Sequence, residues 1–223
     1  MQDYQREFIE FSLDNNVLCF GDFTLKSGRQ SPYFFNSGLF NSGKSLARLG
    51  YFYAQTIKSS GIDFNVLFGP AYKGIPLGSA TTIALAEHFN IDAPYCFNRK
   101  EIKDHGEGGL TLGAPLKGKV LIVDDVISAG TSLNNSIDLI ESFDATAVAL
   151  VIAMDRQEKG RGDLSAVQEA EQLHKIKVLS IIKLENIIKY LQEFPKMEEN
   201  LHNILKYNEK YGVILPQKCG DDT

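Results

Sequence analysis

The stretch 119–132, which reads KVLIVDDVISAGTS, limits the possible folds of this chain more than any other. Its apolar run from Val120 to Val123 is short and continuous, as in a strand that is buried on both faces. Asp124 and Asp125 follow where that strand should end, and residues 133–140 carry apolar side chains at helical spacing. The stretch therefore predicts a strand, an acidic pair, a loop and a helix, in that order.

The loop between the acidic pair and the helix has the properties of an anion site. Backbone N–H groups at a helix N-terminus have no intrahelical partner, and the helix dipole favours an anion there. Ser128, Thr131 and Ser132 add hydroxyl donors, and Gly130 lets a ligand approach the backbone closely. We expect the loop to bind phosphate. The two aspartates would repel a phosphate, and they suit ribose hydroxyls, a magnesium ion, or both.

Simpler interpretations of the same residues remain open. Adjacent aspartates after a strand could cap the next helix, and serine and glycine are common in ordinary turns. Two well-known nucleotide motifs are absent from the sequence. A Walker loop needs G-x-x-x-x-G-K-[ST], but Ile75 follows the closest stretch, 69–74, and no G-x-G-x-x-G follows an early strand.

Composition and charge narrow the class of protein. The formal net charge of −5 argues against a general binder of nucleic acids or membrane surfaces, which would carry a basic field. Cys19, Cys96 and Cys219 are far apart and form no C-x-x-C pair, which is typical of reduced cytosolic thiols. The N-terminus lacks a signal pattern, and no apolar run approaches membrane-spanning length. We expect a cytoplasmic protein with one domain over residues 1–223.

The rest of the chain alternates between strand and helix patterns. Strands are expected at 65–69, 94–97, 120–123, 145–153 and 177–182, and helices at 4–16, 44–60, 79–89, 133–140, 165–174, 184–191 and 195–211. This alternation predicts an α/β fold with a mainly parallel central sheet and helices on both of its faces.

Residues 1–40 do not follow this rhythm and are expected to form a small N-terminal lid. Two short strands should flank a turn at Ser27 and Gly28. Phe34 and Phe35 occupy adjacent strand positions, so their side chains should point to opposite faces. One of them is therefore available to line a planar ligand site, whereas ordinary core packing is the default for such residues.

Four loops follow predicted strands, at 69–78, 98–109, 124–132 and 154–157, so they should gather at one edge of the sheet. Lys73 lies in the first loop and Arg156 in the last. Taken alone, the lysine could be a solvated surface charge and the arginine could pair with Asp155 or a neighbour. The loop 98–109 is rich in cations and glycine, which fits either a solvated face or a lid that closes over pyrophosphate.

Taken as a whole, residues 120–132 resemble the phosphoribosyl-pyrophosphate motif of type I phosphoribosyltransferases. Residues 33–36, 69–77 and 99–106, together with Lys26 and Arg156, resemble the orotate phosphoribosyltransferase family in particular. The resemblance implies the type I fold and a pentosyltransferase of de novo pyrimidine (UMP) biosynthesis. Such an enzyme transfers the 5-phosphoribosyl group from 5-phosphoribosyl 1-diphosphate to orotate, giving orotidine 5'-phosphate and diphosphate.

The resemblance also implies a role for each site residue. The donor would be bound by Lys26, Tyr72, Lys73, Arg99, Lys100, Lys103, His105, Asp124, Asp125, Val126, Ile127, Ser128, Ala129, Gly130, Thr131 and Ser132. Orotate would be held by Phe34, Phe35, Ser128 and Arg156. Ser128 stands where threonine is common in the family, and it keeps the hydroxyl.

The catalytic residues implied in this way are Lys103, His105, Asp124 and Asp125, with Mg²⁺ near the two aspartates and no direct protein ligand assigned. The chain would form a homodimer in which loop 99–109 crosses to the partner's site. Two other functions stay open. A purine or uracil acceptor would leave Arg156 without an obvious role, and a non-catalytic regulator would usually lose the cationic loop and carry a basic surface.

Overall fold

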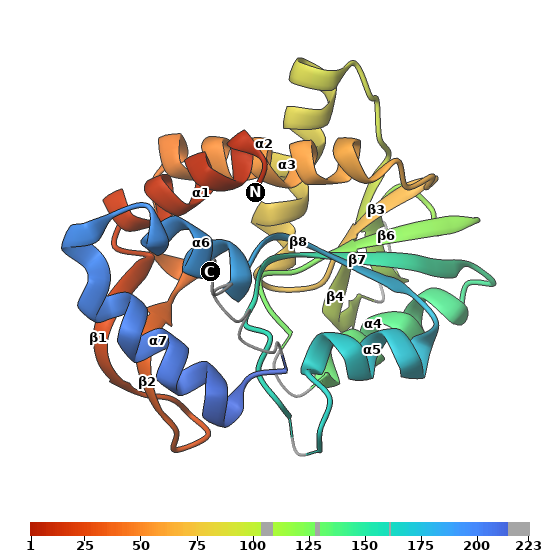
Figure 1. The fold of residues 1–223 in the computed structure, drawn as a ribbon. Helices are drawn as coiled ribbons and strands as arrows, with labels where there is room; N and C mark the ends of the chain where they lie inside the picture. The colour runs from red at the N-terminus through yellow and green to blue at the C-terminus, as the bar shows by residue number, and fades with distance from the viewer. Residues whose placement is uncertain (104–108, 128–129, 161, 214–223) are drawn as a thin grey trace.

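The computed structural model describes residues 1–103, 109–127, 130–160 and 162–213, with the side chains of 100–103 excluded. The main sheet has the order β5-β4-β3-β6-β7-β8 (Figure 1). Its strands are β3 (Val66–Gly69), β4 (Tyr95–Lys103), β5 (Gly109–Gly113), β6 (Lys119–Val123), β7 (Thr146–Asp155) and β8 (Lys177–Lys183). All neighbours pair in parallel except β4 and β5, which confirms the predicted α/β fold.

Helices cover both faces of this sheet, as expected. They are α1 (Asp3–Asp14), α2 (Gly43–Ser60), α3 (Gly74–Phe89), α4 (Thr131–Glu141), α5 (Ala166–His174), α6 (Leu184–Gln192) and α7 (Glu198–Tyr211), with short 3-10 helices η1 (Ser37–Leu39) and η2 (Pro195–Met197). Strand β6 shows how the two cores form. Leu121 and Val123 pack on the side of α1, α2, α3 and α6, whereas Val120 and Ile122 pack on the side of α4 and α5.

The N-terminal residues form the expected two-stranded antiparallel ribbon of β1 (Leu18–Thr24) and β2 (Gln30–Phe35). We call this ribbon, together with α1, the hood. Phe35 packs toward Phe8 of the core with ring centroids 6.3 Å apart. Phe34 is exposed on the other face and stacks on Phe23 at 5.5 Å. The predicted alternation of the two phenylalanines is confirmed.

The C-terminal helix α7 lies against the hood ribbon (Figure 1). Tyr207 of α7 meets Tyr33 of β2 edge-on, with ring centroids 6.3 Å apart. Beyond the helix, Lys159 N–H donates to the carbonyl of Tyr211 at 2.8 Å and Val213 N–H donates to that of Gln157 at 2.9 Å. The end of the described chain is thereby joined to the loop that follows β7. No helix within the described residues is long and apolar enough to cross a membrane.

The helix after β3 begins earlier than expected, at Gly74 instead of residue 79. Pro76 lies in the first turn, where a missing N–H costs nothing because it would have no intrahelical partner. Gly74 is required by close packing, since a Cβ there would lie 2.6 Å from the carbonyl carbon of Gly69. The glycine and proline residues that suggested a loop therefore belong to the start of a helix.

Part of the expected loop 98–109 is strand, and this is a second correction. Strand β4 continues through Lys103, and β5, which was not expected, pairs with it antiparallel from Gly109. Asn98 faces Thr111, so the charged residues after Phe97 extend an arm of two strands from the sheet edge. The pairing partner of β4 is a separate segment, as the pairs Cys96 with Gly113 and Lys103 with Gly109 show, and the local pattern did not reveal this pairing.

Candidate functional site

The carboxylate of Asp125 joins three parts of the chain. Its Oδ2 accepts from Lys73 Nζ at 2.6 Å and from Ser37 Oγ at 2.8 Å, and its Oδ1 accepts from the N–H of Val126 at 2.9 Å. Lys73 follows β3, Ser37 belongs to η1 after the hood, and Asp125 follows β6. The lysine side chain is 63% exposed and the aspartate 11%, so the cation faces solvent above a nearly buried anion.

Asp124 is held by a different set of contacts. Its Oδ1 accepts from the N–H of Asp125 at 2.8 Å, and its Oδ2 accepts from Ser132 Oγ at 3.2 Å. Its carbonyl accepts from the buried hydroxyl of Tyr53 at 2.8 Å. Burial raises the pKa of the Asp124 carboxyl, and the charge of Asp125 adds to that, while hydrogen bonds and Lys73 act in the other direction. Keeping the Asp124 carboxylate ionised in this position therefore costs folding free energy.

A pocket lies between the end of β6 and the start of α4. Its lining includes Asp124, Val126, Ile127, Gly130 and Ser132. Gly130 has a φ of 75°, a left-handed conformation that favours glycine, and it directly precedes the helix. Ser132 and Leu133 of the first turn of α4 line it as well, together with Ile122 and Leu150, so the pocket lies beside a helix N-terminus, where an anion is favoured. Thr131 is exposed at the same helix end, and Ser128 and Ala129 lie outside the described residues.

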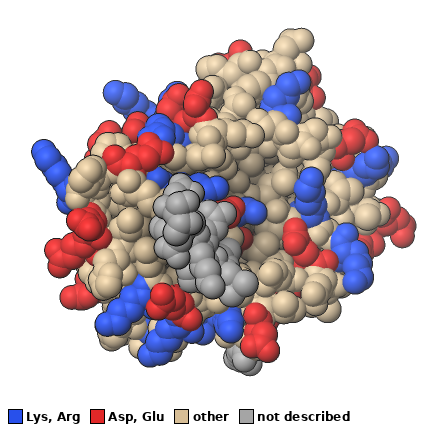
Figure 2. Space-filling model, viewed as in Figure 1, with Lys and Arg blue, Asp and Glu red and all other residues tan. Residues whose placement is uncertain are grey.

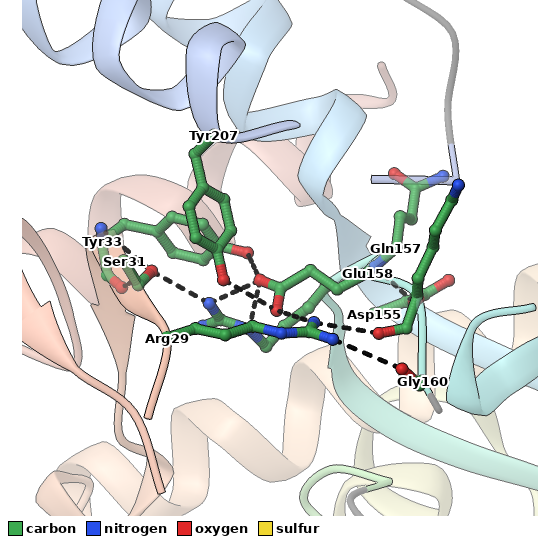
Figure 3. A network of polar contacts seen from close by, with 10 residues as sticks. Arg29, Ser31, Tyr33, Asp155, Gln157, Glu158, Gly160 and Tyr207 are labelled. Atoms are coloured by element: carbon green, nitrogen blue, oxygen red, sulfur yellow. Dashed lines mark hydrogen bonds and ion pairs between the residues drawn. The ribbon is translucent and has the colours of Figure 1, made fainter. Parts of the chain in front are cut away.

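A second cluster surrounds Arg156 at the end of β7, and it is drawn in Figure 3. Arg156 Nε donates to Glu158 Oε1 at 2.8 Å, and Nη2 donates to Ser31 Oγ at 3.1 Å. The guanidinium lies over the ring of Tyr33, 4.1 Å from its centroid. Burial works against the charge, but Tyr33 and Glu158 outweigh it, so the pKa of Arg156 is raised. The simpler interpretation of a salt bridge to a neighbour is met by Glu158 and not by Asp155.

The remaining predicted residues are less closely gathered. Lys26 is exposed at the turn of the hood ribbon, and Tyr72 is exposed beside Lys73. Asn98 Oδ1 accepts from the N–H of Ala71 at 2.7 Å, which joins the base of the arm to the loop after β3. Arg99 is half-buried in β4. The side chains of Lys100 and Lys103, and His105 as a whole, lie outside the described residues.

Several groups of this site were not among the predicted residues. They are Ser31, Tyr33, Ser37, Tyr53, Glu158 and Tyr207. Each acts through a partner far away in the sequence, as the 125 positions between Tyr33 and Glu158 illustrate. No local motif could have indicated them, because the packing of the hood, η1, α2 and α7 on the sheet brings them to the site.

Comparisons with known proteins agree with this arrangement. The model of the phosphoribosyl transferase domain family matches residues 38–178. The chain is 59% identical to the orotate phosphoribosyltransferase of Shewanella oneidensis over 96% of this chain and 99% of that one. It is 57% identical to that of Shigella flexneri, over 96% and 100%. The crystal structure of orotate phosphoribosyltransferase from Francisella tularensis superposes with a TM-score of 0.85 at 46% identity, covering 92% of this chain and 99% of that one.

The raised pKa of Asp124 predicts a pH-dependent stability difference for Asp124→Asn. A carboxyl whose pKa is higher in the folded state favours folding when protonated, and this contribution is lost as the pH rises from the unfolded-state pKa through the folded one. At neutral pH the wild type therefore carries the full cost of a buried charge, which asparagine removes. We expect the variant to melt at a higher temperature at pH 7, without substrate or divalent cation. The difference in melting temperature between the variant and the wild type should narrow as the pH is lowered. A difference that does not change with pH would contradict the raised pKa of Asp124.

Proposed function

The chain belongs to the phosphoribosyltransferase family and, within it, to the orotate phosphoribosyltransferases; on this premise we propose that it transfers the 5-phosphoribosyl group of 5-phosphoribosyl 1-diphosphate to orotate. The products are orotidine 5'-phosphate and diphosphate, in the formation of UMP. The carrying observation is that the predicted groups stand at the ends of three adjacent strands. Lys73 follows β3, the aspartates follow β6 and Arg156 follows β7.

Donor binding is supported by the pocket at the start of α4. The N–H groups of the first turn, with Gly130 and the hydroxyls of Thr131 and Ser132, suit the 5-phosphate. Asp124 and Asp125 stand beside the pocket, where they can accept from the two ribose hydroxyls. Lys73 is in place to meet the pyrophosphate, with Tyr72 beside it, and Lys26, Arg99, Lys100, Lys103 and His105 complete the proposed donor contacts.

The acceptor is argued from Arg156. A guanidinium forms charge-assisted hydrogen bonds with a carboxylate, and orotate carries a carboxylate whereas uracil and the purines do not. Strand β2 meets Arg156 through Ser31 and Tyr33. Phe34 and Phe35, whose side chains point to opposite faces of that strand, are proposed with Ser128 as the orotate contacts. A regulatory protein that binds nucleic acid is disfavoured, because acidic and basic side chains alternate over the face in Figure 2 without a continuous basic area.

The proposed mechanism depends on the charges that develop on the ribose and on the leaving pyrophosphate. The orotate ring nitrogen attacks C1 of the ribose while pyrophosphate leaves, through a transition state with cationic character at the ribose. Negative charge grows on the leaving group, so Lys73 and the cations of the arm stabilise the transition state more than the ground state. Asp124 and Asp125 hold the ribose in line for attack. Lys103 or His105 is proposed to donate a proton or to stabilise the departing charge.

The aspartates also fit a magnesium ion held mainly by the substrate. Both oxygens of Asp125 already accept from the protein, and no cluster of three potential ligands occurs within the described residues. Mg²⁺ usually keeps several waters and binds through one or two carboxylates and substrate phosphates. The ion would neutralise the pyrophosphate, and Asp124 and Asp125 would hold its water ligands.

We also propose a cytoplasmic homodimer of one-domain subunits, in which residues 1–40 form an N-terminal lid that contains the hood. The arm presents an apolar face to solvent. Tyr95, Leu110 and Leu112 are 45%, 39% and 40% exposed, and Phe97 lies between them in register with Leu112. An apolar face on a projecting arm supports contact with a second subunit. Loop 99–109 would then reach the partner's site.

Arg156→Ala tests the acceptor. The wild type should consume orotate, followed by its absorbance, far faster than uracil, adenine or hypoxanthine. The variant should lose about 10- to 150-fold in kcat/KM for orotate, because a charge-assisted contact is worth about 1.5–3 kcal/mol. The KM for the donor should change little. Equal use of uracil by the wild type would refute orotate as the acceptor.

The acidic pair and magnesium are tested together. Asp124→Asn and Asp125→Asn should each lower turnover while circular dichroism shows an intact fold, since neither side chain is part of the hydrophobic core. Removing divalent ions with excess chelator should abolish activity in the wild type, and added Mg²⁺ should restore it. Full activity in the chelator would remove the metal from the mechanism.

The shared site is tested by mixing two inactive variants, Lys103→Ala (arm) and Asp125→Asn (pocket). After subunit exchange about half of the dimers are mixed, and one of their two sites combines intact parts, so roughly a quarter of wild-type activity should return. An inactive mixture, with exchange shown separately by labelled subunits, would mean that the arm serves its own chain.

A further inference from the structure

Glu158 is the centre of the cluster around Arg156. Its Oε1 accepts from Arg156 Nε at 2.8 Å and from the hydroxyl of Tyr33 at 3.0 Å. Its Oε2 accepts from the hydroxyl of Tyr207 at 3.1 Å and lies 3.7 Å from Arg29 Nη1. The glutamate side chain is 11% exposed, and Figure 3 shows Tyr33 and Tyr207 pointing toward it. The guanidinium of Arg29 passes beside it and donates to the carbonyls of Lys159 at 2.9 Å and Gly160 at 3.3 Å. A nearly buried carboxylate is thus satisfied on both oxygens.

The tyrosine hydroxyls that donate to Glu158 are neutral, so the negative charge of Glu158 is balanced only by the arginines. Burial raises the pKa of Tyr33 well above the ordinary range, and burial with the nearby glutamate raises that of Tyr207 to about 12. Both phenols therefore stay neutral at physiological pH and donate to Glu158. One carboxylate then stands against two guanidinium groups, Arg29 and Arg156. The cluster keeps one positive charge in excess, which an anionic substrate can neutralise.

The orientation of Arg156 is fixed from three sides. Glu158 holds Nε, the ring of Tyr33 supports the guanidinium plane, and Ser31 Oγ accepts from Nη2. The hydroxyl proton of Ser31 is directed to the carbonyl of Tyr33 at 2.7 Å, so a lone pair of its oxygen faces Arg156. Nη2 also lies 2.6 Å from Glu158 Oε1, so of the five N–H donors of the guanidinium these contacts engage those on Nε and Nη2. The arginine is immobilised before a ligand arrives, so less side-chain entropy is lost on binding.

We propose that Glu158 is the positioning residue of the acceptor site: held by the hydroxyls of Tyr33 and Tyr207, its carboxylate orients the Arg156 guanidinium to receive the carboxylate of orotate. This inference rests on the proposed function, since it assigns Arg156 to orotate. It also gives the C-terminal helix α7 a part in acceptor recognition through Tyr207. Tyr33 and Tyr207 both lie outside residues 38–178, which match the general family model.

Glu158→Gln keeps the shape of the side chain and removes its charge. We expect the KM for orotate to rise about tenfold, which is what one charge-assisted hydrogen bond is worth. The KM for the donor and kcat should stay within twofold of the wild type. Tyr207→Phe should raise the KM for orotate in the same direction by a few fold. The Tyr207→Phe variant is the second test if the Glu158→Gln variant does not fold. Glu193→Gln, at an exposed glutamate that pairs with Arg6 at 2.6 Å, is the matched control and should change nothing.

A double-mutant cycle separates positioning from general stability. In an Arg156→Ala background, Glu158→Gln should change the KM for orotate less than twofold, because the group that it positions is gone. A tenfold effect that persists in that background, or an equal rise in the KM for the donor, would overturn the inference. An unchanged KM for orotate in both Glu158→Gln and Tyr207→Phe would do so as well. In each case a wild type that converts orotate leaves the proposed function standing, whereas a wild type that does not convert it refutes that function first.

Discussion

The site depends on strand β6 being clamped between β3 and β7. Ile122 pairs with Phe68 on one side and with Leu150 on the other, and apolar side chains cover both faces of the strand. The clamp continues past the strand, since Asp124 N–H donates to Val151 and Ala153 N–H donates to the carbonyl of Asp125. Two charged residues are therefore held on rigid backbone at the point where the hydrophobic core ends. Lys73 and Ser37 both meet the Asp125 carboxylate at this point.

The proposed donor and acceptor sites are built in different ways. The donor side uses backbone placed by adjacent strands, with short side-chain contacts such as that between Lys73 and Asp125. The acceptor side is a side-chain network in which β2, the end of β7 and α7 each contribute, with Glu158 in common. The first kind of site can be shared across a family with different acceptors, since it depends on sheet topology. The second can change with a few side chains outside residues 38–178.

Burial of polar groups gives both sites their electrostatic character. Tyr53 is buried with its hydroxyl on the Asp124 carbonyl, and burial raises its pKa, so it is a fixed neutral donor. Tyr33 is likewise a buried neutral donor, and its hydroxyl donates to Glu158. Charges in such places are costly unless they are paired, and those near Arg156 are paired with one positive charge in excess. This excess of positive charge at the end of β7 favours a bound anion.

The sequence by itself determined the parallel strands of the sheet and the ribbon. An apolar run such as 120–123 must be buried on both faces, and the alternation of such runs with helical patterns leaves few topologies other than a parallel sheet. It also placed Lys73, the acidic pair and Arg156 at one edge, because the ends of parallel strands meet there. Local patterns failed where distant segments decide the outcome: helix α3 starts at Gly74 because Gly69 lies against it, and β5 forms because β4 offers a ladder. Only the tertiary structure decided that Glu158 meets Tyr33 and Tyr207, since contacts between residues 125 and 49 positions apart leave no periodic trace in a chain.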